Sequence, residues 1–290
     1  MGRNEHTRTW LATGTSSGIG LEAVRQLLAR GYRVAATTRD QARLADLAAE
    51  YDRDRLWTAE LDLTNAAQIA AVVDEAFEHF GRIDVVLSNA GYGLFGAAEE
   101  VSDEQIDRQL QTNLLAPIRL LRAAVPHLRA QGGGRWIQVS SSGGEVPDPA
   151  MSLYNAGKYG VEGFFGSVAI ELAPLGIDVI LAVPSATRTN FFASMDWGAP
   201  LDAYRDTPVG RLRAALQGEA GAGHIDSGPM GDPARIAAAL IDVAQQSSPP
   251  SRLILTARAY EAIEAGLQQR LSELRAQQGV AYAVDTSTTS

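Results

Sequence analysis

Short apolar segments alternate with longer amphipathic ones along most of the chain, and this alternation constrains the fold more than any other feature. Most of the short segments lack polar alternation, which is typical of strands buried on both faces of a parallel sheet. They lie at Thr9–Thr13, Arg33–Thr38, Arg55–Leu61, Ile83–Ser88, Arg135–Ser140, Ile177–Val183 and Arg252–Thr256. The helix patterns between them cover Gly18–Arg30, Asn65–Phe80, Ser102–Ala130, Ser152–Ala173 and Pro233–Gln246. The sequence therefore predicts an α/β fold, with a doubly wound parallel sheet of about seven strands and right-handed crossovers.

We predict that residues 1–278 of the 290-residue chain form one domain, because doubly wound α/β folds often reach this length. Residues 187–232 contain many glycines and prolines but no clear strand pattern. A long irregular segment in a compact domain is usually a lid or a binding loop, so we predict a substrate lid there. Residues 279–290 are small and polar, and we predict a flexible tail.

Composition and charge exclude several functional classes. The formal net charge of −9 argues against nucleic acid and anionic membranes as partners. The absence of cysteine excludes disulfides, thiolate zinc sites and cysteine nucleophiles. The histidines show no metal-ligand spacing, so we predict no metal site. No segment has the length and apolarity of a membrane span, and no secretory signal pattern opens the chain. We therefore expect a cytoplasmic protein.

A glycine-rich turn links the first predicted strand to the first predicted helix. Gly14, Gly18 and Gly20 would let the backbone turn tightly, approach a pyrophosphate and pack the helix against the sheet. The positive end of the helix dipole would then face the phosphates. The alternative is a simple strand-to-helix turn, which rarely needs three glycines. The turn therefore predicts a dinucleotide site.

The end of the second strand indicates which dinucleotide binds. An acid normally stands there to bind the ribose 2′-hydroxyl of NAD, whereas this chain has Thr38 followed by Arg39. A guanidinium can hold a 2′-phosphate, which an acid would repel, so we predict NADP(H) rather than NAD(H). The alternative is that Arg39 is only a solvated surface residue. Asp62, after the third strand, could accept from the adenine amine or could instead cap the helix that begins near Asn65.

Tyr154 and Lys158 are the candidate reacting pair. They lie four residues apart in a helix pattern and therefore share one face. Lys158 is the only lysine in the chain, against 24 arginines. An ammonium near a phenol favours the phenolate, so we expect Lys158 to lower the pKa of Tyr154. The alternative is an ordinary pair on a helix surface.

Taken together, these motifs resemble those of the short-chain dehydrogenase/reductase family over residues 8–260. The resemblance implies a single-domain Rossmann fold. Two stretches, Ala36–Asp40 and Asn89–Gly93, are similar to the branch of 17β-hydroxysteroid and retinol dehydrogenases. The matching family motifs are Thr13–Gly20, Asn89-Ala90-Gly91, Asn113 in Gln-Thr-Asn-Leu, Ser140-Ser141-Ser142 and Tyr154 with Lys158.

The resemblance implies a catalytic set of Asn113, Ser141, Tyr154 and Lys158. Ser141, 13 positions before the tyrosine, would hydrogen-bond the substrate oxygen, with Ser140 and Ser142 as alternatives. Asn113 would hold a water that links Lys158 to solvent. Tyr154 would donate the proton to, or accept it from, the substrate oxygen.

The resemblance also implies a set of cofactor-binding residues. Ser16 and Arg39 would meet the 2′-phosphate, Ser17 the pyrophosphate and Thr189 the carboxamide, while Asn89 would brace the central strands. The full set is Gly14, Ser16, Ser17, Gly18, Ile19, Gly20, Arg39, Asp62, Leu63, Asn89, Ala90, Gly91, Tyr154, Lys158, Pro184, Thr187 and Thr189.

The chain departs from the family pattern at two positions. Gly157 replaces a serine beside Lys158, and Ser185 replaces a glycine after Pro184. If the backbone at position 185 needs a positive φ, Ser185 is strained or the loop differs.

These features predict an NADP(H)-dependent oxidoreductase that interconverts a ketone or aldehyde with an alcohol. The alternatives are a non-catalytic NADP(H)-binding sensor or scaffold, and an isomerase or dehydratase on the same fold. We also expect a homodimer or homotetramer paired through the helices at 102–130 and 152–173. Aromatic residues at 92, 95, 191, 192, 197 and 204 either line an apolar pocket or pack the lid. Arg188 is the one charge expected near that pocket.

Overall fold

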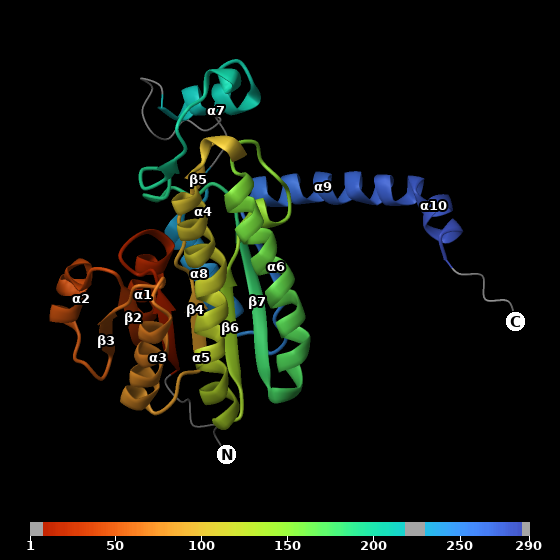
Figure 1. Ribbon diagram of the computed structural model, residues 1–290. Helices are drawn as coiled ribbons and strands as arrows, with labels where there is room; N and C mark the ends of the chain where they lie inside the picture. Colours follow the sequence, from red (N-terminus) through yellow and green to blue (C-terminus); the bar gives the residue numbers. More distant parts are fainter. Residues whose placement is uncertain (1–7, 218–229, 286–290) are drawn as a thin grey trace, which may run out of the picture.

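The computed structural model describes residues 8–217 and 230–285, and a seven-stranded parallel sheet forms its centre (Figure 1). The strand order is β3-β2-β1-β4-β6-β7-β9, so the chain reverses its direction of winding between β1 and β4. This confirms the predicted fold class and number of strands. The strands are β1 Thr9–Thr13, β2 Arg33–Thr38, β3 Leu56–Glu60, β4 Val85–Ser88, β6 Gly134–Val139, β7 Ile177–Pro184 and β9 Arg252–Leu255.

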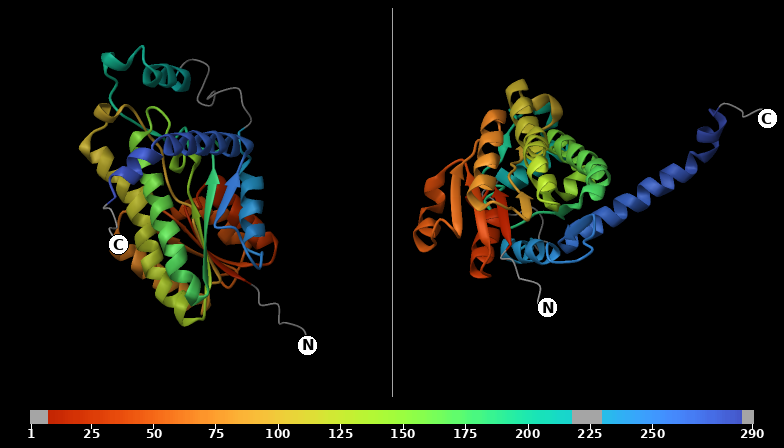
Figure 2. Two further views of the ribbon diagram at one scale, coloured as in Figure 1. Left: turned by 90° about the vertical axis from the view of Figure 1, so that its right-hand side faces the viewer. Right: turned by 90° about the horizontal axis from the view of Figure 1, so that it is seen from below.

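Helices cover both faces of this sheet (Figure 2). One face carries α3 (Ala66–Phe80), α5 (Ala116–Ala130) and α6 (Ser152–Leu172), and the other carries α1 (Gly18–Ala29) and α8 (Pro233–Val243). A 3-10 turn, Gln41–Leu44, and a short helix, α2 (Ala45–Glu50), connect β2 to β3. None of the helices in these described ranges has the length and apolarity of a membrane span.

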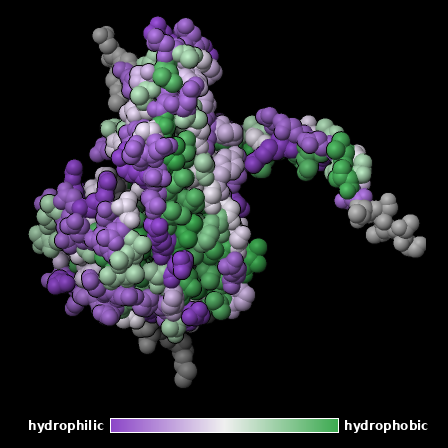
Figure 3. Space-filling model, in the orientation of Figure 1, coloured by the Kyte–Doolittle hydropathy of each residue, from purple (hydrophilic) through white to green (hydrophobic). Residues whose placement is uncertain are grey.

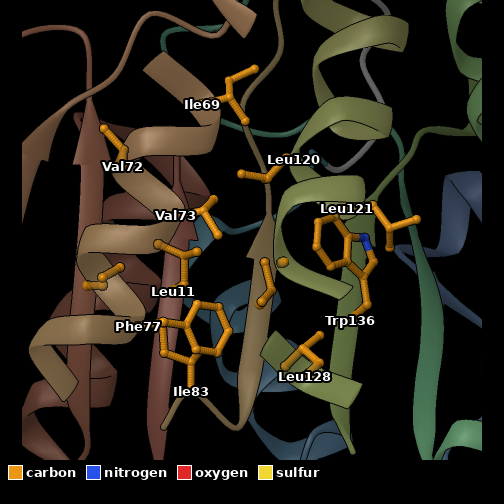
Figure 4. Packing of buried hydrophobic residues seen from close by; sticks show 14 of the residues in the cluster. Leu11, Ile69, Val72, Val73, Phe77, Ile83, Leu120, Leu121, Leu128 and Trp136 are labelled. Carbon is orange, nitrogen blue, oxygen red and sulfur yellow. The ribbon is translucent and has the colours of Figure 1, made fainter. Parts of the chain in front are cut away.

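The core on the α3–α5–α6 side shows why the amphipathic patterns become helices. Phe77, Leu120 and Trp136 are almost completely buried between the helices and the sheet (Figure 4). Each helix can bury its apolar stripe only by packing on a face of the sheet. The same reason explains why helices cover the other face. This packing fixes the carboxyl ends of the strands at one edge, where open α/β sheets bind ligands.

The predicted helix at 102–130 is interrupted in its first half. The segment begins as α4 (Asp103–Leu110), continues as a π-helical turn (Gln111–Leu115) and resumes as α5. Single π-helical turns inside longer helices often occur at functional sites, and this one contains Asn113. A hydrophobic period of 3.6 residues does not reveal such a turn, because the apolar stripe continues on both sides.

The segment predicted as an irregular lid contains short elements. They are β8 (Asp196–Trp197), a 3-10 turn (Asp202–Tyr204) and α7 (Pro208–Gln217). β8 pairs in parallel with β5 (Leu94–Phe95), so residues about a hundred positions apart form a separate two-stranded sheet. A two-residue strand has no readable period, which is why the sequence did not indicate it. Residues 218–229 of the predicted lid lie outside the described residues.

The C-terminal helices were not predicted. Helix α9 (Ala257–Ala276) leads away from the body of the molecule, and α10 (Gln278–Ala283) follows it (Figure 1). Residues 279–283, predicted to be a flexible tail, are therefore helical; they continue the chain beyond α9 without packing on the sheet. Residues 286–290 lie outside the described residues.

Candidate active site

A large cleft opens at the carboxyl ends of the central strands. Its volume is about 1260 Å³, and its walls come from the glycine-rich turn, the ends of the central strands, the start of α6 and the segment after β7. Of the predicted site residues, all line this cleft except Gly20 and Asn113. Gly20 packs beneath the turn, and Asn113 lies behind Gly91.

The geometry of the glycine-rich turn fits a bound pyrophosphate. Gly14 and Gly18 have φ values of 68° and 56°, which favour glycine. A Cβ at Gly20 would lie 2.3 Å from the carbonyl oxygen of Gly14, so the helix can approach the turn only without a side chain. Ser17, the N-cap of α1, makes no side-chain capping bond. The first amides of α1 therefore keep their capacity to bind an anion.

Asn89 fixes the shape of this turn. Its side-chain amide donates to the carbonyl oxygens of Thr13 (3.2 Å) and Gly14 (3.1 Å). Its backbone N–H donates to the hydroxyl of Thr13 at 3.1 Å. These bonds join the end of β4 to the end of β1, which is the bracing that the resemblance implied.

Arg39 and Asp62 stand at the outer end of the cleft. Arg39 is exposed and lines the cleft, and no carboxylate in the described parts of the chain is within ion-pair distance of it. Asp62 accepts from the backbone N–H (2.9 Å) and hydroxyl (2.8 Å) of Thr64, and these bonds lower the pKa of its carboxyl. The N-cap of α3 is Asn65, which accepts from Ala67 and Gln68. The interpretation of Asp62 as the cap of that helix is therefore wrong.

Lys158 lies under the floor of the cleft. It is 5% exposed, and its Nζ donates to the carbonyl oxygen of Val139 at 3.1 Å. Burial lowers the pKa of Lys158 to about 8, although the charge of Glu162 opposes this change. Its Nζ is 5.8 Å from the centre of the Tyr154 ring, so the spacing of four residues does place both side chains on one face of α6. The alternative of an exposed surface pair is wrong, because both side chains are buried.

Tyr154 has a raised pKa, contrary to the sequence prediction. Burial raises the pKa of its hydroxyl to about 12; the hydrogen bond with Ser141 opposes this, and the charge of Asp148 adds to it. The cost of charging a phenol away from water therefore exceeds any stabilisation from the nearby Lys158. Tyr154 consequently carries its proton throughout the neutral pH range.

Ser141 is the serine that meets the tyrosine. It begins a 3-10 turn, Ser142–Gly144, and its Oγ accepts from the backbone N–H of Gly143 at 3.1 Å. Its hydroxyl is also close enough to that of Tyr154 to favour the phenolate and so to counteract the rise in the Tyr154 pKa. Two hydroxyl groups, from Ser141 and Tyr154, thus lie side by side on the wall of the cleft and can donate to the same oxygen atom.

Asn113 makes contacts that differ from its implied role. Its side chain accepts from the backbone N–H of Tyr92 at 3.1 Å and donates to the carbonyl oxygen of Tyr92 at 2.7 Å. A Cβ at Gly91 would lie 3.2 Å from Asn113 Oδ1 and 3.8 Å from Lys158 Nζ, so only a glycine separates the two side chains. The Asn113 amide therefore holds the chain after β4 in place, and its role in a proton relay stays a prediction.

The two departures from the family pattern are accommodated. In the described parts of the chain, the non-glycine residues with positive φ are Ala150 and Thr256, so Ser185 is not strained. Its hydroxyl hydrogen-bonds that of Thr256 at 2.8 Å. A Cβ at Gly157 would lie 3.6 Å from the Cβ of Asn113, an ordinary contact, so glycine is not required there.

The charges of the cleft differ from those expected. Arg188 forms an ion pair with Asp232 at 3.1 Å and does not line the cleft. Arg108, Asp148 and Arg258 line it instead. The sequence did not reveal these residues, because Arg258 belongs to the unpredicted α9 and the other two lie outside the recognised motifs. No group of three or more potential metal-ligating side chains occurs within the described ranges.

The predicted aromatic residues divide between two roles. Tyr92, Phe95, Phe191 and Phe192 line the cleft together with Met195, and the Phe191 ring meets the Tyr154 ring edge-on at 5.8 Å. Two others pack the lid: Trp197 lies 4.8 Å from the ring of Phe95, and Tyr204 donates to Glu99.

Comparison with known proteins identifies the family. The family described as short chain dehydrogenase matches residues 8–197. Oxidoreductase BOA17 of Botryotinia fuckeliana is 33% identical over 88% of this chain and 91% of its own length. Human 17-beta-hydroxysteroid dehydrogenase type 1 is 32% identical over 69% of this chain and 62% of its own.

Solved structures agree with this result. A short-chain dehydrogenase from Streptomyces avermitilis is 32% identical and matches with a TM-score of 0.87 over 98% of this chain and 100% of that one. An alcohol dehydrogenase from Thermococcus sibiricus, complexed with 5-hydroxy-NADP, is 25% identical, with a TM-score of 0.69 over 86% and 96%. A 3-ketoacyl-(acyl-carrier-protein) reductase from Brucella melitensis, complexed with NADH, is 26% identical, with a TM-score of 0.68 over 85% and 96%. The fold, the cleft and these relatives together show that the chain belongs to the short-chain dehydrogenase family of oxidoreductases.

Proposed function

We propose that the protein is an NADP(H)-dependent oxidoreductase that interconverts a ketone or aldehyde with an alcohol on a bulky apolar substrate. One observation carries the proposal. A neutral Tyr154 hydroxyl, with the Ser141 hydroxyl beside it, lies in the same cleft as a glycine-rich turn that fits a pyrophosphate.

In the reductive direction, the carbonyl oxygen of the substrate accepts hydrogen bonds from Ser141 and Tyr154. When bound, a nicotinamide dinucleotide would supply the hydride that the carbonyl carbon accepts. As negative charge develops on the oxygen, Ser141 stabilises it and Tyr154 transfers its proton there. Lys158 then stabilises the phenolate that Tyr154 has become until a proton from solvent restores the hydroxyl. Oxidation of an alcohol follows the same steps in reverse.

The preference for NADP(H) rests on the end of β2. Thr38 stands where an acid would bind a ribose hydroxyl, and the Thr38 hydroxyl accepts from the backbone N–H of Asp40 at 3.2 Å. Arg39 is exposed beside it, so its guanidinium is available to a 2′-phosphate. Solved relatives carry either NADP or NADH, so the preference depends on these residues of this chain.

The apolar substrate class rests on the inner end of the cleft. Phe191, Phe192 and Met195 line it from the segment after β7, next to Tyr154. Arg108, one of the charged residues of the cleft, forms an ion pair with Asp196 and is therefore neutralised. An uncharged molecule with a large apolar surface fits such a lining. The similarity to a relative named for a steroid substrate supports the same class.

A turnover assay tests the proposal against its alternatives. Purified protein and NADPH are mixed with a panel of cyclic or aryl ketones and aldehydes and with a matched panel of sugars and keto acids. We expect NADPH consumption with a higher kcat/KM on the apolar panel. Cofactor binding without any turnover would instead indicate a sensor or scaffold. Conversion of substrate without net NADPH consumption would indicate an isomerase or dehydratase.

A further inference from the structure

Among the described residues, helix α9 contacts the body as far as Arg270. Thr256 caps it by accepting from the N–H of Ala259, and Ala259 and Ile263 are buried against the body. A Cβ at Gly266 would lie 2.9 Å from Val146, so this glycine permits a close approach. Beyond Arg270, which lies 3.6 Å from Glu145, the helix projects away from the body (Figures 1 and 2).

An apolar stripe runs along the whole of α9, including the projecting half. Its members are Tyr260, Ile263, Leu267, Leu271 and Leu274. At about 100° per residue they fall within an arc of about 80°. Tyr260, Leu267, Leu271 and Leu274 are 58%, 52%, 45% and 67% exposed. A stripe of this size normally packs against another surface, and the described part of the chain provides none for its outer half.

The spacing of this stripe is symmetric. Successive members are three, four, four and three residues apart, so the stripe reads the same from either end about Leu267. A second α9 in antiparallel orientation would therefore present the matching exposed face: Leu267 meets Leu267 and Tyr260 meets Leu274, while Leu271 lies at the rim of the body that buries Ile263. Self-complementarity about a central point is what a two-fold symmetric interface requires.

Charges beside the stripe favour the antiparallel orientation. Glu261, Glu264 and Arg275 are exposed and project on the same side of the stripe, with the acids near the start of α9 and the arginine near its end. Antiparallel pairing brings the acids of one helix beside the arginine of the other.

The body leaves room for this arrangement. In the described parts of the chain, α9 meets its own body up to Arg270, so its projecting end can lie over the first turns of a partner helix. Figure 3 shows apolar side chains gathered over α5 and α6, below the projecting arm, and Ile170 on α6 is 78% exposed. A two-fold axis through Leu267 would bring two such bodies side by side beneath the paired arms.

We propose that the protein forms a two-fold dimer in which α9 pairs antiparallel with α9 of a second copy, centred on Leu267. The occupant of the exposed stripe is thus the same stripe of another copy. This interface is separate from the helices α4 to α6 that the sequence analysis favoured for pairing, and it does not depend on the proposed catalytic function.

Sedimentation analysis of the full chain tests the interface. We expect twice the 30.8 kDa chain mass for the wild type, and a dissociation constant raised about a hundredfold or more by Leu267→Lys, which places two unpaired charges in an apolar contact. Ala265→Lys is the matched control, because it adds the same charge to the exposed opposite face of α9. A monomeric wild type overturns the proposal. So does equal weakening by both variants, or a dimer that only Ile170→Lys dissociates.

Disulfide trapping tests the orientation, because the chain contains no cysteine of its own. Leu267→Cys should oxidise to a covalent dimer, whereas Leu274→Cys alone should not, because antiparallel pairing separates the two copies of residue 274. A mixture of Tyr260→Cys and Leu274→Cys chains should form a covalent heterodimer. Efficient cross-linking of Leu274→Cys with itself would show parallel pairing and overturn the proposal. Circular dichroism verifies that each variant is folded.

Discussion

Replacement of Tyr154 by phenylalanine is the sharpest test of the proposed chemistry, because it removes one hydroxyl and little else. The ring that meets Phe191 edge-on stays in place. The variant loses one polar atom that lies beside Ser141, so the free energy of folding should change by no more than about 1 kcal/mol. The variant should therefore fold and bind NADP(H) with nearly unchanged affinity.

The expected loss of activity follows from the protonation state of the residue. With a pKa of about 12, Tyr154 holds its proton at neutral pH and is ready to act as a general acid. General acids contribute about 10²- to 10⁴-fold to a rate, or about 3 to 5 kcal/mol of activation free energy. Ser141→Ala keeps the proton donor but removes one hydrogen bond to the developing oxyanion, so its rate should fall by about 10²- to 10³-fold.

The assay is single-turnover oxidation of NADPH by the best ketone of the panel, with cofactor affinity measured separately by fluorescence titration. A loss of kcat with unchanged cofactor affinity supports the mechanism. If Tyr154→Phe retains a kcat within about tenfold of wild type, below the range for a general acid, the assigned proton donor is wrong.

Three further predictions concern the cofactor, pH and the glycine turn. Titrations with both cofactors should show that the wild type binds NADP(H) at least about tenfold more tightly than NAD(H), or by about 1.4 kcal/mol. Arg39→Asp should remove this preference. Equal affinities in the wild type would refute the prediction. Because burial raises the pKa of Tyr154, the protonated form predominates at neutral pH. The rate of reduction should hence change little between about pH 5 and 7 and fall above about pH 8, where Lys158 loses the charge that stabilises the phenolate. Alcohol oxidation, which needs the phenolate, should rise about tenfold per pH unit up to about pH 8. A plateau in oxidation near pH 7 would contradict the raised pKa. Gly20→Ala should weaken cofactor binding at least about tenfold, because its Cβ would lie 2.3 Å from the Gly14 oxygen. Gly163→Ala, whose Cβ meets nothing within 4 Å, is the control and should instead raise the free energy of unfolding by about 1 kcal/mol in calorimetry.

The sequence determined the parts of the protein that depend on neighbouring residues. Buried parallel strands and amphipathic helices have periods that show within about ten residues, so the sheet and the helices around it could be predicted. The glycine turn and the spacing of Tyr154 and Lys158 are equally local. The sequence also predicted that the glycine turn and the Tyr154–Lys158 pair meet at one cleft, because the strands of a parallel sheet have their carboxyl ends at the same edge.

The tertiary structure decided the features that depend on contacts between distant segments. The pKa of Tyr154 rises because the surrounding chain excludes water, and no spacing of residues reveals that exclusion. The strand pair β5–β8 joins segments about a hundred residues apart, and α9 leaves the body where its packing partners end. In each case the deciding energy comes from burial or a long-range hydrogen bond, which exists only once the chain has folded.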